Sequence, residues 1–200
     1  MKPSLEFWFD FASTYSYPAA MRIEARALEA GVGLQWRPFL LGPIFAEQQG
    51  IHDSPFNVYP ARGRYMWRDL ERLCAKHALP WKRPSVFPRN SVLAARVALL
   101  ASSEPWGPAF IRSLFEANFG SDLDIASEDV VRDLLVRAGQ PSELLGRALA
   151  PEHKGLLREQ TAKAAAHGIF GAPNFRVGNE LFFGQDRLDD ALEWAKRSMG

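Results

Sequence analysis

Residues 5–17 read LEFWFDFASTYSY, and this stretch decides how the whole chain is interpreted. Residues 5–11 are short, aromatic and followed by small polar residues, which predicts a β-strand. Residues 15–30 carry apolar side chains at helical spacing, and Gly31 predicts the end of that helix. Residues 33–39 alternate in polarity and predict a second strand. Because the segment between the helix and the second strand is short, this β–α–β order predicts two parallel strands joined by a right-handed crossover.

The β signal returns only near the end of the chain. Asn174–Val177 and Glu180–Phe183 flank Gly178-Asn179, a two-residue turn, and therefore predict a β-hairpin. Between residues 42 and 150 the pattern predicts helices and loops without a convincing strand. Residues 186–197 predict a final helix.

The two β-containing ends cannot form separate domains. Neither a lone β–α–β unit nor a hairpin with one helix can bury both faces of its strands. We therefore expect the two ends to assemble into one mixed sheet of an α/β fold. The predicted organisation is a discontinuous domain, residues 1–41 and 151–200, interrupted by an all-helical insertion at residues 42–150.

The composition is that of a soluble globular chain of 200 residues, with 47% apolar and 24% charged side chains. A net charge of +1 gives no electrostatic reason to expect nucleic acid or an anionic membrane as partner. The sequence has neither a signal peptide nor an apolar run of membrane-spanning length, so we expect a cytoplasmic protein. Fourteen phenylalanines and six tryptophans suit a core with an aromatic-lined cleft.

The single cysteine, Cys74, excludes an intramolecular disulfide and a cysteine-based metal site. The four histidines are scattered and none has zinc-ligand spacing, so no metal site is expected. Cys74 lies on an apolar helical stripe and is interpreted as a core residue.

Ser13 is the first candidate for chemistry. It lies where the first strand passes into a helix, which places its hydroxyl beside free backbone N–H groups and the positive end of the helix dipole. An anion is stabilised at such a position. The alternative is that Ser13 only caps the helix. A hydrolytic serine nucleophile is disfavoured, because the chain shows no G-x-S-x-G elbow and no assignable base.

Residues 170–175, read as FGAPNF, form the second candidate segment. A proline directly before a strand is a place where a cis peptide bond is kept. With a cis bond before Pro173, the N–H and C=O of Ala172 can pair with an extended peptide ligand, which Gly171 would allow to approach. The alternative is an ordinary proline at the entry to a strand.

The third segment runs from Gly184 through Gln185 and Asp186 to Arg187, where the hairpin ends and a helix begins. A helix start suits a carboxylate, so Asp186 could accept an ammonium group and Arg187 could bind a carboxylate. The alternative is a charged first helical turn without a ligand.

Five short motifs occur in the order found in one known family. They are F-D-F-x-S-x-x-S-Y at 9–17, P-x-R-x-x-Y-x-x-x-D-L-x-R at 60–72, F-P-R-N-S at 87–91, G-x-P at 171–173 and G-x-D-R at 184–187. Together they resemble the 2-hydroxychromene-2-carboxylate isomerases, which are related to kappa-class glutathione transferases. The resemblance implies a thioredoxin-like fold of the DsbA type with a helical insertion. The family's Cys-x-x-Cys positions hold Ser13 and Ser16, which excludes dithiol redox chemistry.

The resemblance also implies glutathione as cofactor. Ser13 would be the catalytic residue, donating a hydrogen bond to the glutathione sulfur and favouring the thiolate. The cysteinyl backbone would pair with Ala172 beside Pro173. The γ-glutamyl group would bind the remaining residues implied as cofactor ligands, which are Gly184, Gln185, Asp186 and Arg187.

In that family the thiolate adds reversibly to an aromatic enone. The addition interconverts the cyclic hemiketal acid 2-hydroxychromene-2-carboxylate and the open trans-o-hydroxybenzylidenepyruvate in aromatic catabolism. Asn57, Arg89 and Asn90 are the candidate substrate-binding residues, although each could equally solvate a loop or cap a helix. Related proteins are dimers, so a homodimer is expected. The alternatives are a kappa-like transferase that consumes glutathione and a thioredoxin-fold binding protein without catalysis.

Overall fold

The computed structural model describes residues 3–197 of the chain. One mixed sheet holds four strands in the order β2-β1-β3-β4. They are β1 (Ser4–Phe9), β2 (Gly33–Pro38), β3 (Asn174–Val177) and β4 (Glu180–Phe183). β1 pairs in parallel with β2 and antiparallel with β3, and β3 pairs antiparallel with β4. The two ends of the chain therefore share a sheet, as predicted.

Helices make up the rest of the fold. They are α1 (Ser16–Ala30), α2 (Leu41–Gln49), α3 (Pro55–Val58), α4 (Pro60–Lys76), α5 (Val92–Ala101), α6 (Gly107–Phe119), α7 (Glu128–Arg137), α8 (Glu143–Leu149), α9 (Pro151–Ala166), the 3-10 turn η1 (Gln185–Arg187) and α10 (Leu188–Arg197). Among the residues that the structure describes, no strand lies between β2 and β3, so the predicted helical insertion is confirmed as all-helical. Its domain boundaries at residues 41/42 and 150/151 stay a prediction.

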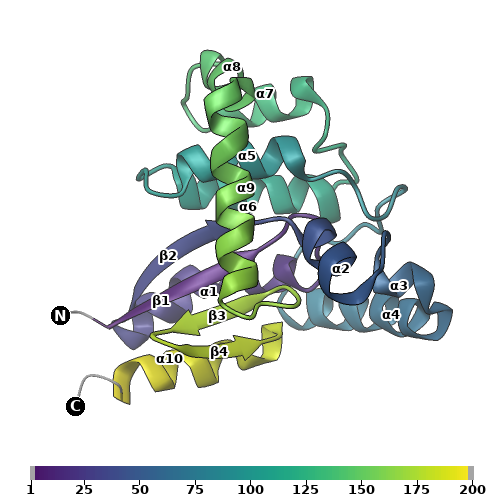
Figure 1. Cartoon of the computed structure of the whole chain (residues 1–200), viewed down its shortest axis with the longest axis vertical. Coiled ribbons are helices and arrows are strands. Elements are labelled where there is room, and N and C mark those ends of the chain that lie inside the picture. The colour runs from purple at the N-terminus through teal and green to yellow at the C-terminus, as the bar shows by residue number, and fades with distance from the viewer. Residues whose placement is uncertain (1–2, 198–200) are drawn as a thin grey trace.

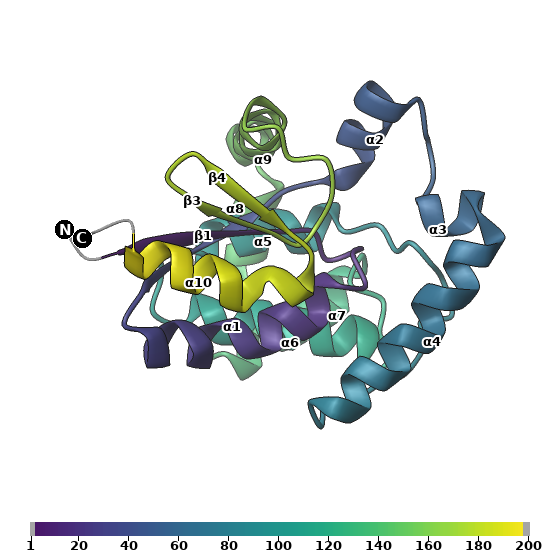
Figure 2. The ribbon, with the colours of Figure 1, turned by 90° about the horizontal axis from the view of Figure 1, so that it is seen from below.

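The alternation of side chains along β1 gives the sheet two covered faces. Leu5, Phe7 and Phe9 belong to the large core with Phe175, and the rings of Phe7 and Phe175 stack with centroids 5.5 Å apart. Trp8 points the other way into a smaller core with residues of α2 and α9. Figure 2 shows α2 and α9 on one side of the sheet and α1 and α10 on the other. No helix within residues 3–197 is long and apolar enough to cross a bilayer.

The sheet topology brings the three candidate segments to one edge. β1 and β2 are parallel and end at the same edge. β3 runs against β1 and starts at that edge, where Trp8 pairs with Asn174, and β4 ends there, where Phe183 pairs with Asn174. The stretches that follow β1, precede β3 and follow β4 therefore meet at this edge of the sheet, in which Figure 1 shows β1, β3 and β4 side by side.

Cys74 lies on α4 in the large core and is only 1% exposed. Burial raises the pKa of its thiol to about 11. We therefore expect native protein at pH 8 to react with a thiol reagent such as DTNB at least about 100-fold more slowly than free cysteine, whose pKa is about 8.5. Protein unfolded in guanidinium should react at once and provides the control. Rapid stoichiometric labelling of the native protein would contradict the core assignment.

Candidate functional site

A cavity of about 1150 Å³ opens at this edge of the sheet. Small-ligand pockets typically measure about 300–1,000 Å³, so this one has room for more than one small molecule. All three candidate segments contribute to its lining, as do α2 and the loop before α5. The aromatic side chains in the lining are Tyr15, Phe45, Phe56, Phe87, Phe170 and Phe183. The aromatic-lined cleft expected from the composition is therefore present.

Ser13 lies in the cavity lining, three residues before α1 begins. Its hydroxyl donates to the carbonyl oxygen of Ala172 at 2.9 Å, and its oxygen accepts the N–H of Ser16 at 3.3 Å. The N–H of Ser16 opens the helix, so Ser13 supports the helix start while its hydroxyl reaches the segment before β3. The N-cap residue of α1 is Tyr15, so Ser13 contacts the helix start without being its cap, and the predicted role of Ser13 toward an anion stays a prediction.

The Ala172–Pro173 peptide bond is cis, and so is the Phe87–Pro88 bond, which the sequence analysis did not anticipate. Ala172 lines the cavity, and its N–H donates to no acceptor within residues 3–197. Gly171 lies in the cavity lining. A Cβ there would lie 2.6 Å from the Phe183 ring, so the glycine accommodates that ring, and its expected role in admitting a ligand stays a prediction.

The turn after β4 completes this wall of the cavity. Gly184 has φ +109°, which favours glycine, and its N–H donates to the carbonyl oxygen of Pro173 at 3.0 Å. Gln185 and Asp186 line the cavity, but Arg187 does not. The guanidinium of Arg187 binds Asp186 at 3.1 Å and Asp190 at 2.8 Å, so the structure gives it carboxylate partners of its own.

Asp10 belongs to the motif at residues 9–17, although the sequence alone predicted no role for it. Its carboxylate is almost fully buried and accepts hydrogen bonds from Ala12 N–H (2.9 Å), Leu41 N–H (2.7 Å) and the Ser91 hydroxyl (2.6 Å). Burial raises the pKa of Asp10, and the three donors act in the opposite direction. Asp10 thus ties the loop before Ser13 to the starts of α2 and α5. A lone carboxylate in the otherwise apolar run 7–11 was the available signal.

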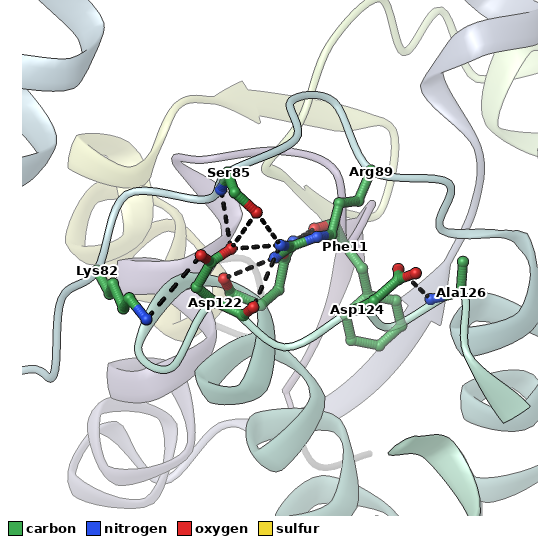
Figure 3. A network of polar contacts seen from close by, with 8 residues as sticks. Phe11, Lys82, Ser85, Arg89, Asp122, Asp124 and Ala126 are labelled. Carbon is green, nitrogen blue, oxygen red and sulfur yellow. Dashed lines mark hydrogen bonds and ion pairs between the residues drawn. The ribbon is translucent and has the colours of Figure 1, made fainter. Parts of the chain in front are cut away.

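The Arg89 side chain is buried and its terminal nitrogens are bound within the protein (Figure 3). Nη1 donates to the Asn118 side-chain oxygen at 2.9 Å, and Nη2 forms an ion pair with Asp122 and a 3.2 Å hydrogen bond to Ser85. Asn118 in turn donates to the carbonyl oxygen of Phe11 at 2.9 Å. Arg89 therefore lies in the cavity lining, as predicted, but both of its terminal nitrogens already bind protein acceptors.

The two asparagines proposed for substrate binding also have protein partners. Asn57 donates to Asp53 and to the carbonyl oxygen of Phe87, and it lines a separate surface groove outside the main cavity. Asn90 lies in the cavity lining, and its side-chain oxygen accepts the N–H of Val92 at the start of α5. Asn90 therefore supports the start of α5 from the residue before the N-cap, Ser91.

Arg62 on α4 is the cation that the sequence analysis passed over. It is exposed, lines the cavity, and has no carboxylate partner among residues 3–197. Its guanidinium lies over the Tyr59 ring, 4.7 Å from the centroid. Its place in the motif at 60–72 was the signal that could have identified it. Within residues 3–197 no group of three or more histidine, cysteine or acidic side chains is arranged to hold a metal ion.

Comparison with known proteins places this geometry in a family. The pattern of the DSBA-like thioredoxin domain matches residues 4–193. The chain belongs to that family. Its four-stranded mixed sheet and its helical insertion are thus those of a DSBA-like domain.

Among its relatives, a 2-hydroxychromene-2-carboxylate isomerase of Sphingobium xenophagum is 28% identical over 94% of this chain and 96% of its own length. Glutathione S-transferase kappa 1 of Caenorhabditis elegans is 26% identical over 93% of this chain and 88% of its own. A solved structure of a 2-hydroxychromene-2-carboxylate isomerase has a TM-score of 0.87 at 23% identity, covering 98% of this chain and 95% of that one. These relatives are isomerases and glutathione transferases within one fold.

The ion pair between Arg89 and Asp122 predicts how the stability of the fold depends on pH. The Ser85 N–H and the Arg89 guanidinium lower the pKa of Asp122 from 3.8 to about 2. A carboxyl with a lowered native pKa stabilises the fold above its unfolded pKa and loses this contribution as pH falls through the native one. We expect Arg89→Met to lower the melting temperature by about 5–10 °C at pH 7. The difference should shrink between about pH 4 and pH 2.

Thermal unfolding followed by circular dichroism at pH 7, 4 and 2.5 measures this effect. Arg68→Met is the matched control, because Arg68 forms an exposed i,i+3 ion pair with Glu71. Equal melting temperatures for the Arg89 variant and the wild type at pH 7 would show that the buried pair carries no stability.

Proposed function

We propose that this protein is a glutathione-dependent isomerase that interconverts 2-hydroxychromene-2-carboxylate and trans-o-hydroxybenzylidenepyruvate. One observation carries the proposal. The Ser13 hydroxyl, the Ala172 backbone and the Gly184–Asp186 turn line a single cavity, and the chain has serines at residues 13 and 16, where the family resemblance places the redox cysteines. A site of this kind needs a thiol from outside the protein.

The residues present fit glutathione. Ala172 N–H is a donor without a partner within residues 3–197, and the carbonyl oxygen of the same residue accepts the Ser13 hydroxyl. Asp186 offers a carboxylate to an ammonium group. Because Arg187 is outside the lining, we leave it out of the proposed ligand set.

Ser13 would act by exchanging its hydrogen-bond partner. Its single proton is now directed to the carbonyl oxygen of Ala172. A peptide N–H that bonds to this carbonyl releases the hydroxyl to donate to a sulfur atom. The start of α1 adds positive potential at the same point. A free thiol is only a few per cent ionised at pH 7, so these two effects would raise the reactive fraction.

Glutathione, when bound, supplies a thiol whose reversible addition to a conjugated enone allows rotation about the former double bond. The protein's own part is to hold the acceptor. The aromatic side chains Phe45 and Phe56 line the cavity and suit an aromatic ring. Since Arg89 is bound to Asp122, Arg62 is the guanidinium in the lining that we assign to the substrate carboxylate.

Isomerisation of trans-o-hydroxybenzylidenepyruvate, followed by its ultraviolet absorbance, tests the proposal. We expect activity to require glutathione. Ser13→Ala should lower kcat/KM by about 10- to 100-fold, because a hydrogen bond to a charged group is lost. Thr14→Val is the matched control, since the neighbouring Thr14 hydroxyl donates to the Met66 sulfur, and it should retain activity. Full activity without glutathione would contradict the mechanism.

A kappa-like transferase is the second candidate, favoured by the kappa-class relative and by a cavity large enough for a separate electrophile. The thiol balance separates the two reactions. We expect free glutathione, titrated with DTNB after complete conversion, to be unchanged. Loss of one thiol per product molecule would indicate conjugation. The buried Cys74 does not interfere while the protein is folded.

A further inference from the structure

Arg22 links α1 to the turn that follows β4. Its Nε donates to the carbonyl oxygen of Pro18 in the first turn of the same helix, at 2.9 Å. Its Nη2 donates to Gln185 twice, to the side-chain oxygen at 2.8 Å and to the main-chain oxygen at 3.2 Å. The two residues are 163 positions apart in the sequence. The guanidinium thus spans from the helix that begins beside Ser13 to a residue in the cavity lining.

These contacts close a ring around one wall of the cavity. Ser13 accepts from the start of α1 and donates to Ala172. The neighbouring Pro173 accepts the N–H of Gly184 through its carbonyl oxygen. Gln185 follows Gly184 and accepts from Arg22, which returns to α1. Neighbouring members of this ring are joined either by a hydrogen bond or by one or a few residues of the chain. A displacement of the Gly184–Asp186 turn would therefore lengthen the other hydrogen bonds of the ring.

We propose that Arg22 is a positioning residue for the glutathione site. By holding Gln185, it keeps the Gly184–Asp186 turn at a fixed spacing from Ser13, so that one ligand can contact both. The inference rests on the proposed function. Arg22 itself lies outside the cavity lining and acts through Gln185.

The burial of Arg22 makes this arrangement specific. The side chain is half-buried, and a guanidinium removed from water is stable only when its N–H groups have acceptors. Burial lowers the pKa of Arg22 and nearby Asp189 opposes that shift, but a guanidinium stays protonated at neutral pH. Because the guanidinium is planar and has several donors, it bonds to the Pro18 carbonyl oxygen and to Gln185 at the same time. The ammonium group of a lysine is a compact point charge and does not reproduce this pair of contacts.

Arg26, one turn further along α1, provides a matched control. Its Nε and Nη2 both bind Asp189, at 3.0 and 2.8 Å, so it also joins α1 to the C-terminal segment. Arg26 is exposed, and neither it nor Asp189 lines the cavity. Loss of Arg26 therefore removes a link of the same kind without touching the turn.

The test is titration calorimetry with reduced glutathione on the purified full chain. We expect Arg22→Met to raise Kd by about tenfold, because charge-assisted hydrogen bonds are lost. Arg22→Lys should fall between Arg22→Met and the wild type, and Arg26→Met should stay within about twofold of the wild type. In the isomerase assay, KM for glutathione should rise in Arg22→Met while kcat at saturating glutathione is retained.

Gln185→Ala tests the contact from its other side and serves if Arg22→Met does not fold. It should weaken glutathione binding, and the loss in the double variant should be smaller than the sum of the two single losses, because both changes remove the same Arg22–Gln185 contact. Unchanged Kd in Arg22→Met, or equal losses in Arg22→Met and Arg26→Met, overturns the positioning role. No binding to the wild type refutes the proposed function itself, which separates the two failures.

Discussion

The buried carboxylate of Asp10 is the constraint on which the site depends. A carboxylate removed from water is costly unless donors surround it, and here the donors come from three separate places in the chain. Ala12 belongs to the loop after β1, Leu41 opens α2, and Ser91 precedes α5. Satisfying one charge therefore brings together the parts that frame the cavity. Ser13, three residues after Asp10, is fixed as a consequence, and its N–H donates to the Asp10 carbonyl oxygen.

A second buried polar residue supports the same loop from the insertion. Asn118 on α6 donates to the Phe11 carbonyl oxygen and accepts from Arg89. The helical insertion thus contributes a hydrogen bond to the backbone between β1 and α1, in addition to covering the sheet. The sheet and the insertion depend on each other at the position where the proposed chemistry takes place. A rigid support of this kind suits a serine whose role is to orient one hydrogen bond.

Ser13 and Ser16 lie at the start of α1, where the family resemblance places the two redox cysteines. Serine is close to cysteine in size, but it leaves this part of the site without a sulfur nucleophile. In the proposed function a thiol peptide replaces the missing cysteine, and the protein retains the parts that bind a peptide backbone. Arg22 would then matter because a ligand that spans two segments needs both at a constant separation.

The sequence by itself determined the features that depend on neighbouring residues. Periodicity and turn residues gave the β–α–β unit, the hairpin at Asn174–Val177 and Glu180–Phe183, and the helical insertion, because strand and helix patterns are local. The strand order β2-β1-β3-β4, which only the structure shows, then brings Ser13, Ala172 and Gly184 to one sheet edge. Only the tertiary structure decided the partners of the charged residues. Arg89 looked free for a substrate because its partner Asp122 is 33 positions away, and Arg22 gave no local signal because Gln185 is 163 positions away. Burial and ion pairing depend on which distant segments meet, and no local pattern contains that information.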